Sequence, residues 1–246
     1  MKASETKKKA PKILLFGPYG SGKTCFATTA GACTQILDLD QGLNSVLSLK
    51  DKFSTARGEV DVLEAHENEP DRALAFMKAR SYIQSIASQC RKGTYPFKIL
   101  VIDSLTNLHE YGMRMLLANS GLLGQKPRIQ DWMMRDIEFL NICIILKSLP
   151  IAVVLTAHQQ VVEQDETMVV TPFLPGKSLP PNLISKFDEV LYMKSVLVAG
   201  GLTDFIVQNV STTSVRVRTR ANFPNNFNSN EGLAKLLELM GYNVKE

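Results

Sequence analysis

The sequence has 246 residues, of which 45% are hydrophobic and 21% are charged, and this balance excludes a disordered chain, a collagen-like repeat and a disulfide scaffold. The formal net charge is +4, and residues 1–12 account for it with five lysines and one glutamate. The rest of the chain is formally neutral, which excludes a basic surface spread over the whole protein. We expect a basic flexible arm over 1–11 and a single domain over 12–246.

The four cysteines show no CxxC spacing, and the three histidines complete no metal-ligand run. This usage is typical of a reduced, cytoplasmic protein. The most apolar segment, 142–155, is interrupted by Lys147 and Pro150, so we expect no membrane partner.

Apolar runs alternate with amphipathic stretches along the first two thirds of the chain. In chain order they predict strand 13–16, helix 22–31, strand 35–40, helix 70–92, strand 97–103, helices 105–117 and 129–146, and strand 151–156. This alternation predicts an α/β fold with a mostly parallel central sheet that helices cover on both faces.

The pattern changes after His158. Residues 161–173 alternate like a hairpin, and 190–219 contain further short β segments. We therefore expect antiparallel strands in the C-terminal third, followed by a closing helix over 231–240.

The first predicted strand is followed directly by a phosphate-binding motif, G-x-x-x-x-G-K-[ST]. Backbone N–H groups of such a loop converge on phosphate oxygens, the lysine reaches the β- and γ-phosphates, and the hydroxyl residue binds Mg²⁺. The loop predicts a nucleotide site formed by Gly17, Pro18, Tyr19, Gly20, Ser21, Gly22, Lys23 and Thr24.

Tyr19 has three possible placements. Its ring could stack on a neighbouring subunit, stack on a base, or face solvent as a filler of the loop.

An apolar run ends in an acid at Asp103, which is the Walker B pattern, and predicts a carboxylate on the Mg²⁺ side of the site. The alternative is that Asp103 caps the following helix, a role that Ser104 could also fill.

Hydrolysis also needs a group that orients the attacking water, and acids at the carboxyl ends of strands are the candidates. Asp40 ends the stretch QILDLD and is the first choice. Asp38, two residues earlier on the same strand, is expected to face the same side but to lie deeper in the protein. His158 and Gln159 follow strand 151–156 at the same edge, and one of them is expected to sense the γ-phosphate. The alternative for these two is a solvated polar cluster.

The order of these motifs, GPYGSGKT, QILDLD, ILVIDS and LTAHQ before a β-rich end, resembles the RecA-like branch of P-loop ATPases. The stretches IQDWMMRDIEFLN, PFLPGKSLPPNLISKFDEV and RVRTR look like the compact phage-type single-strand annealing recombinases. The resemblance implies ATP and Mg²⁺ as cofactors, with Lys23, Thr24 and Asp103 in the matching roles. It places Asp40 where RecA-like proteins carry a catalytic glutamate, and His158-Gln159 near their γ-phosphate-sensing amide.

The resemblance also implies partners. It assigns 160–178, with Lys177, to the region that contacts single-stranded DNA, and the arm residues Lys7, Lys8 and Lys9 can contact phosphates as well. It implies a homo-oligomer, a ring or filament, in which Arg218 or Arg220 reaches the ATP of a neighbour. A single-strand DNA-binding protein is a further expected partner. The alternative for the two arginines is a solvated charged edge.

Two functions compete on these grounds. The first is a DNA-dependent ATPase that binds single-stranded DNA and promotes annealing or strand exchange. The second is a nucleotide-switch ATPase that loads or regulates a replication partner protein.

Overall fold

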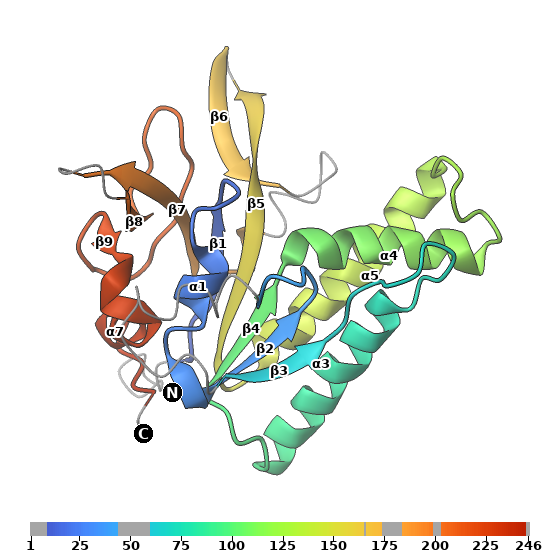
Figure 1. Ribbon diagram of the computed structural model, residues 1–246, viewed down its shortest axis with the longest axis horizontal. Helices are drawn as coiled ribbons and strands as arrows, with labels where there is room; N and C mark the ends of the chain where they lie inside the picture. Colours follow the sequence, from blue (N-terminus) through green and yellow to red (C-terminus); the bar gives the residue numbers. More distant parts are fainter. Residues whose placement is uncertain (1–8, 44–59, 165, 174–183, 199–202, 245–246) are drawn as a thin grey trace, which may run out of the picture.

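The computed structural model describes residues 9–43, 60–164, 166–173, 184–198 and 203–244. Its central feature is a nine-stranded sheet with the order β3-β2-β4-β5-β1-β7-β8-β9, to which β6 is attached through β5 (Figure 1). The strands are β1 (Lys12–Gly17), β2 (Thr34–Asp38), β3 (Asp61–Glu64), β4 (Ile99–Asp103), β5 (Ala152–Gln164), β6 (Thr167–Pro172), β7 (Glu189–Leu197), β8 (Thr203–Gln208) and β9 (Phe227–Asn228).

Pairing is parallel from β3 to β7 and antiparallel at β7–β8, β8–β9 and β5–β6. The predicted fold class is therefore confirmed: a mostly parallel sheet carries antiparallel strands in its C-terminal third. Because β1, β4 and β5 are parallel, their carboxyl ends meet at one edge of the sheet, where ligands bind in such folds.

The side chains of each central strand alternate between two cores. On one face, Leu14, Phe16 and Leu100 belong to a core that includes buried residues of the long helices α3 (Ala75–Lys92), α4 (Leu105–Asn119) and α5 (Ile129–Ser148). On the other face, Ile13 and Val101 belong to a core with α1 (Lys23–Ala27) and α7 (Gly232–Leu239). Figure 1 shows these two helix layers on opposite sides of the sheet.

Several predicted boundaries were wrong. Helix 22–31 ends at Ala27 and gives way to a turn and a 3₁₀ helix, Gly31–Cys33. Strand 35–40 ends at Asp38, helix 70–92 begins at Ala75, and strand 97–103 begins at Ile99. The sequence analysis missed β3, because an edge strand with three exposed residues in four carries no apolar run.

Lys12 lies at the start of β1 and is 4% exposed. It therefore contributes nothing to the charge of the amino-terminal arm. In the described part of the chain, no helix is long and apolar enough to cross a membrane.

Candidate nucleotide-binding site

The phosphate loop connects the end of β1 at Gly17 to the start of α1 at Lys23. Gly20 and Gly22 have φ values of 71° and 81°, a region that residues with a side chain rarely adopt. A Cβ at Gly17 would collide with the carbonyl oxygen of Met193 on β7. The glycines of the motif are therefore required by this turn and by its close approach to a neighbouring strand.

Lys23 points back into the loop. Its ammonium donates hydrogen bonds to the carbonyl oxygens of Gly17 at 3.1 Å and Pro18 at 2.8 Å. Burial lowers the pKa of Lys23 to about 8, although the nearby Asp103 and Asp40 carboxylates act in the opposite direction. The cation is thus positioned beside the loop that the motif assigns to phosphate.

Asp103 is the last residue of β4 and accepts hydrogen bonds from two threonines. Thr24 Oγ1 donates to its Oδ2 at 2.8 Å, and the Thr156 hydroxyl makes a short hydrogen bond to its Oδ1. Burial, followed by the charge of Asp40, raises the pKa of Asp103 to about 6. A threonine hydroxyl beside a buried carboxylate is a set of hard oxygen donors that fits Mg²⁺. Thr24 and Asp103 could therefore hold the ion.

The capping alternative for Asp103 is wrong. Ser104 is the N-cap of α4, where its Oγ accepts a hydrogen bond from the backbone N–H of Asn107 at 3.3 Å. The Ser104 hydroxyl also donates to Oδ1 of Asp40 at 2.9 Å. One serine thus anchors both the helix and the candidate water-orienting acid.

Asp40 and Asp38 differ in their surroundings. Asp40 lines the cavity beside Asp103 and lies 3.8 Å through Oδ2 from Nε2 of His158. Burial raises its pKa, and the Ser104 hydrogen bond acts against this rise. Asp38 is buried, accepts hydrogen bonds from the backbone N–H groups of Asp40 and Gly42, and is absent from the cavity lining. The geometry favours Asp40 over Asp38 for contact with a ligand.

His158 and Gln159 point to different places. His158 lines the cavity and its ring stacks on the Tyr19 ring, with 4.0 Å between centroids. Burial and the Lys23 charge lower the pKa of His158. Gln159 accepts a hydrogen bond through Oε1 from the Tyr192 hydroxyl at 2.9 Å. The structure thus brings only His158 of this pair to the site.

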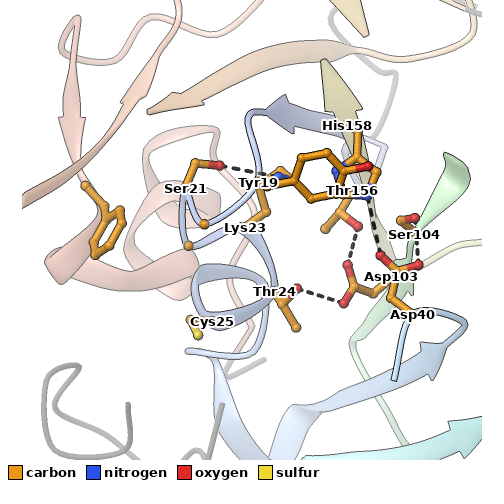
Figure 2. Close-up of a pocket in the computed structure, with 13 residues that line it drawn as sticks. Tyr19, Ser21, Lys23, Thr24, Cys25, Asp40, Asp103, Ser104, Thr156 and His158 are labelled. Carbon is orange, nitrogen blue, oxygen red and sulfur yellow. Dashed lines mark hydrogen bonds and ion pairs between the residues drawn. The ribbon is translucent and has the colours of Figure 1, made fainter. Parts of the chain in front are cut away.

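The cavity has a volume of about 230 Å³ and is lined by the loop, by both acids and by Phe205 on β8. Figure 2 shows the loop residues Lys23 and Thr24 on one side and the two acids on the other. Sequence analysis missed four lining residues, Cys25, Thr156, Phe205 and Ser104, the last of which was considered only as a helix cap. Thr156 could have been found, because it has the same strand parity as His158 and ends an apolar run. Phe205 could not, since only the order of β7 and β8 beside β1 brings it to the loop.

Arg218 and Arg220 lie toward the amino-terminal ends of the parallel strands, away from the nucleotide site. The backbone of Arg218 pairs with Val190, which lies opposite Leu14 near the start of β1. Arg220 forms an ion pair with Asp188 at 3.3 Å. Neither arginine reaches the cavity of its own chain, and their action on a neighbour stays a prediction.

The predicted DNA-contacting lysines are only partly described. Lys9 is exposed just before β1. Lys7, Lys8 and Lys177 lie outside the described residues.

These features define a P-loop ATPase that binds nucleotide: a buried parallel strand, a glycine loop closed by Lys23 and Thr24, and an acid on a nearby strand. Proteins of this class typically use Mg²⁺. Residues 9–222 match the family described as AAA domain, and the chain belongs to that family. No curated protein matches the chain.

Proposed function

We propose that this AAA-family P-loop ATPase hydrolyses ATP with Mg²⁺ and couples turnover to single-stranded DNA, promoting annealing or strand exchange. The observation that supports coupling between ATP turnover and DNA is the length of β5. This strand of 13 residues passes Thr156 and His158 through the site and continues without a break into the hairpin with β6. A change at the nucleotide therefore has a direct structural route to the hairpin.

The site's own residues support hydrolysis as follows. Lys23 offsets phosphate charge, and Thr24 with Asp103 holds Mg²⁺, which when bound neutralises charge on the phosphate oxygens. Asp40, held by Ser104, orients the attacking water and accepts its proton. Burial raises the pKa of Asp40, which makes the carboxylate a stronger base than an exposed aspartate.

His158 serves as the γ-phosphate sensor in this proposal. Its Nδ1 is buried and has no hydrogen-bond partner among the described residues, and its ring lines the cavity together with Tyr19. A histidine with an unused nitrogen can form a hydrogen bond to a phosphate oxygen. Formation or loss of that bond would act at the base of the hairpin.

In this proposal the DNA contact lies in the later part of the segment 160–178. The hairpin residues Glu163 and Glu166 are acidic and repel phosphates. Lys9 precedes β1 at the amino-terminal end of the parallel strands, at the end opposite the hairpin. The resemblance to annealing recombinases assigns the contact to 160–178, with Lys177 as its cation.

Oligomer formation, with Arg218 or Arg220 acting on a neighbour's ATP, belongs to the same proposal.

The first experiment measures ATP hydrolysis by wild type and Lys23→Ala, with and without a single-stranded oligonucleotide, at low and physiological salt. We expect stimulation by DNA in the wild type, weakened by salt, and no turnover in Lys23→Ala. Lys177→Ala, which removes the cation that the resemblance assigns to the DNA contact, should keep its basal rate and lose most of the stimulation. Lys23-dependent turnover that ignores DNA at both salts would reject the coupling.

A second candidate, the nucleotide switch that regulates a replication protein, is favoured by a row of apolar side chains on α5. Ile129, Met133, Ile137 and Ile144 recur at helical spacing and are 51% to 83% exposed. Exposed apolar patches of this kind mark protein contacts. Ile137→Lys provides the matched variant: it should abolish capture of a replication protein and leave any DNA stimulation intact.

A further inference from the structure

We propose that Tyr19 is a positioning residue: its ring holds the His158 ring beside Asp40 and so links the phosphate loop mechanically to β5 and the hairpin. The inference rests on the proposed function, in which Asp40 orients water and His158 senses the γ-phosphate. It gives Tyr19 a role that differs from stacking on a base, stacking on a neighbouring subunit or filling the loop.

The first argument is the geometry of the two rings. Their centroids are 4.0 Å apart and their planes are inclined by 29°, which is a stacked arrangement. Tyr19 is nevertheless 82% exposed, so core packing does not hold its ring in place. An exposed aromatic ring with one face on a histidine contributes through that contact, because stacked aromatic pairs attract each other beyond the area that they bury. Figure 2 shows the Tyr19 ring over the cavity, on the same side as His158.

The second argument is the lack of a hydrogen bond to the imidazole within the described residues. The backbone N–H of His158 donates to Thr106 Oγ1 at 3.1 Å, which fixes the main chain but not the ring. Nδ1 has no partner there, and Nε2 is 3.8 Å from Asp40 Oδ2, beyond a hydrogen bond. The His158 side chain is only 17% exposed, and the stack with Tyr19 is the ring contact that we expect to set its orientation.

The third argument is the position of Tyr19 in the loop. It lies between Gly17, which pairs with His158 across β1 and β5, and Gly20, whose φ is 71°. Tyr19 thus moves with the backbone that wraps the phosphates and transmits the movement to a residue of β5. Coupling through directly packed side chains is the physical basis of such a link.

The stack also governs the environment of the imidazole. The groups that face His158 are Tyr19, Asp40 and Lys23. Burial, with a smaller effect of the Lys23 charge, lowers the pKa of His158 below 6.5. Removal of the Tyr19 ring exposes one face of the imidazole to water, and the His158 pKa should then rise toward its ordinary value.

The test compares Tyr19→Ala with Tyr19→Phe, which keeps the ring and loses the hydroxyl. Three quantities are measured: the His158 pKa by NMR of ¹³C-labelled histidine, assigned with His158→Asn; the affinity for ATP; and kcat and KM for ATP. We expect Tyr19→Ala to raise the His158 pKa and lower kcat about 10- to 100-fold with nearly unchanged KM, as for a misplaced catalytic group. Tyr19→Phe should restore most of kcat and a low His158 pKa.

Several results would overturn the inference. A His158 pKa that stays the same in Tyr19→Ala means that the stack does not hold the ring. An unchanged kcat, a loss confined to ATP affinity, or an equal loss in Tyr19→Phe assigns Tyr19 to nucleotide contact or to hydroxyl chemistry. If the wild type hydrolyses no ATP, the proposed function fails by itself. The NMR comparison without nucleotide still decides whether Tyr19 positions His158.

Discussion

The Thr24 hydroxyl donates a 2.8 Å hydrogen bond to Oδ2 of Asp103, which joins the first turn of α1 to the last residue of β4. Two distant parts of the chain, 79 residues apart, are thereby brought together as one pair of oxygen donors. The pair lies beside Lys23 in the cavity. The bond makes Thr24 the most direct probe of the Mg²⁺ site.

We predict that Thr24→Val removes the increase in ATP affinity that Mg²⁺ produces. Valine keeps the volume of threonine and removes the hydroxyl, so the free energy of unfolding should fall by only about 1 kcal/mol. Thr24→Ser keeps the oxygen and should keep the effect of Mg²⁺. Calorimetric titration of ATP in MgCl₂ and in EDTA measures both variants. Equal benefit from Mg²⁺ in Thr24→Val and wild type would contradict the assignment.

Asp40→Asn should lower kcat by about 10²- to 10⁴-fold, the contribution of a general base, with little change in KM. Asp38→Asn is the matched control, because Asp38 holds backbone N–H groups behind the cavity and an asparagine oxygen can still accept them. Steady-state ATPase assays on both variants distinguish the two acids. A loss in Asp38→Asn as deep as that in Asp40→Asn would mean that the wrong acid was chosen.

Gly17 and Gly20 provide a paired test of the loop. Gly17→Ala places a Cβ against the Met193 carbonyl and should destabilise the fold by about 3 kcal/mol, since backbone cannot move aside easily. A Cβ at Gly20 would meet open space, but the Gly20 backbone has a φ of 71°. Gly20→Ala should therefore lower the free energy of unfolding by about 1 kcal/mol. Urea unfolding measures both costs. The reverse order would show that β7 does not constrain the loop.

The parts of the fold that the sequence predicted share one physical cause. Apolar runs such as 13–16 and 151–156 are buried on both faces, so periodicity and burial agree and the central strands were predicted. β3 was missed because three of its four residues are exposed, and its pairing with β2 is not visible in the sequence. Helix 22–31 was predicted too long: after Ala27 the hydroxyls of the β-branched Thr28 and Thr29 donate to carbonyl oxygens of the last turn, and the chain then turns at Gly31, where φ is 67°.

The same distinction separates the predicted and the missed parts of the site. The loop 17–24 and Asp103 follow local motifs, and the structure brings loop residues 19–24 and Asp103 together in one cavity. Phe205 and the stack of Tyr19 on His158 depend on which strands are neighbours in space. Sequence spacing contains no record of that order, so only a structure could reveal them.

Phe205 on β8 lines the cavity next to the phosphate loop, where a Cβ at Gly22 would lie 3.3 Å from its ring. The acids and Lys23 assign their own part of the cavity to the γ-phosphate, so we expect the base near Phe205. Phe205→Ala should weaken ATP binding by about 1–3 kcal/mol, as for loss of a base-stacking ring. Inhibition by tripolyphosphate, which has no base, should stay unchanged and serves as the control. Equal weakening of both ligands would place the effect in the loop itself.

The last prediction concerns pH and a buried cation far from the cavity. The Lys12 ammonium donates to the carbonyl oxygens of Ala10, Leu149 and Ile151. Burial nonetheless lowers its pKa from 10.5 to about 8, with Asp188 acting against the shift. A cation whose pKa is lower in the folded state binds fewer protons there than in the unfolded chain. The contribution of Lys12 to stability must therefore rise with pH between the two values, by about 3 kcal/mol.

Lys12→Met isolates this contribution, because all other groups titrate alike in both proteins. The free energy of unfolding, measured by urea titration from pH 7 to pH 10.5, should increase more in the wild type than in the variant. The divergence should begin near pH 8. If the two proteins follow parallel curves, the Lys12 ammonium is as well stabilised by its three carbonyl partners as by water. Its pKa in the fold would then be the ordinary one.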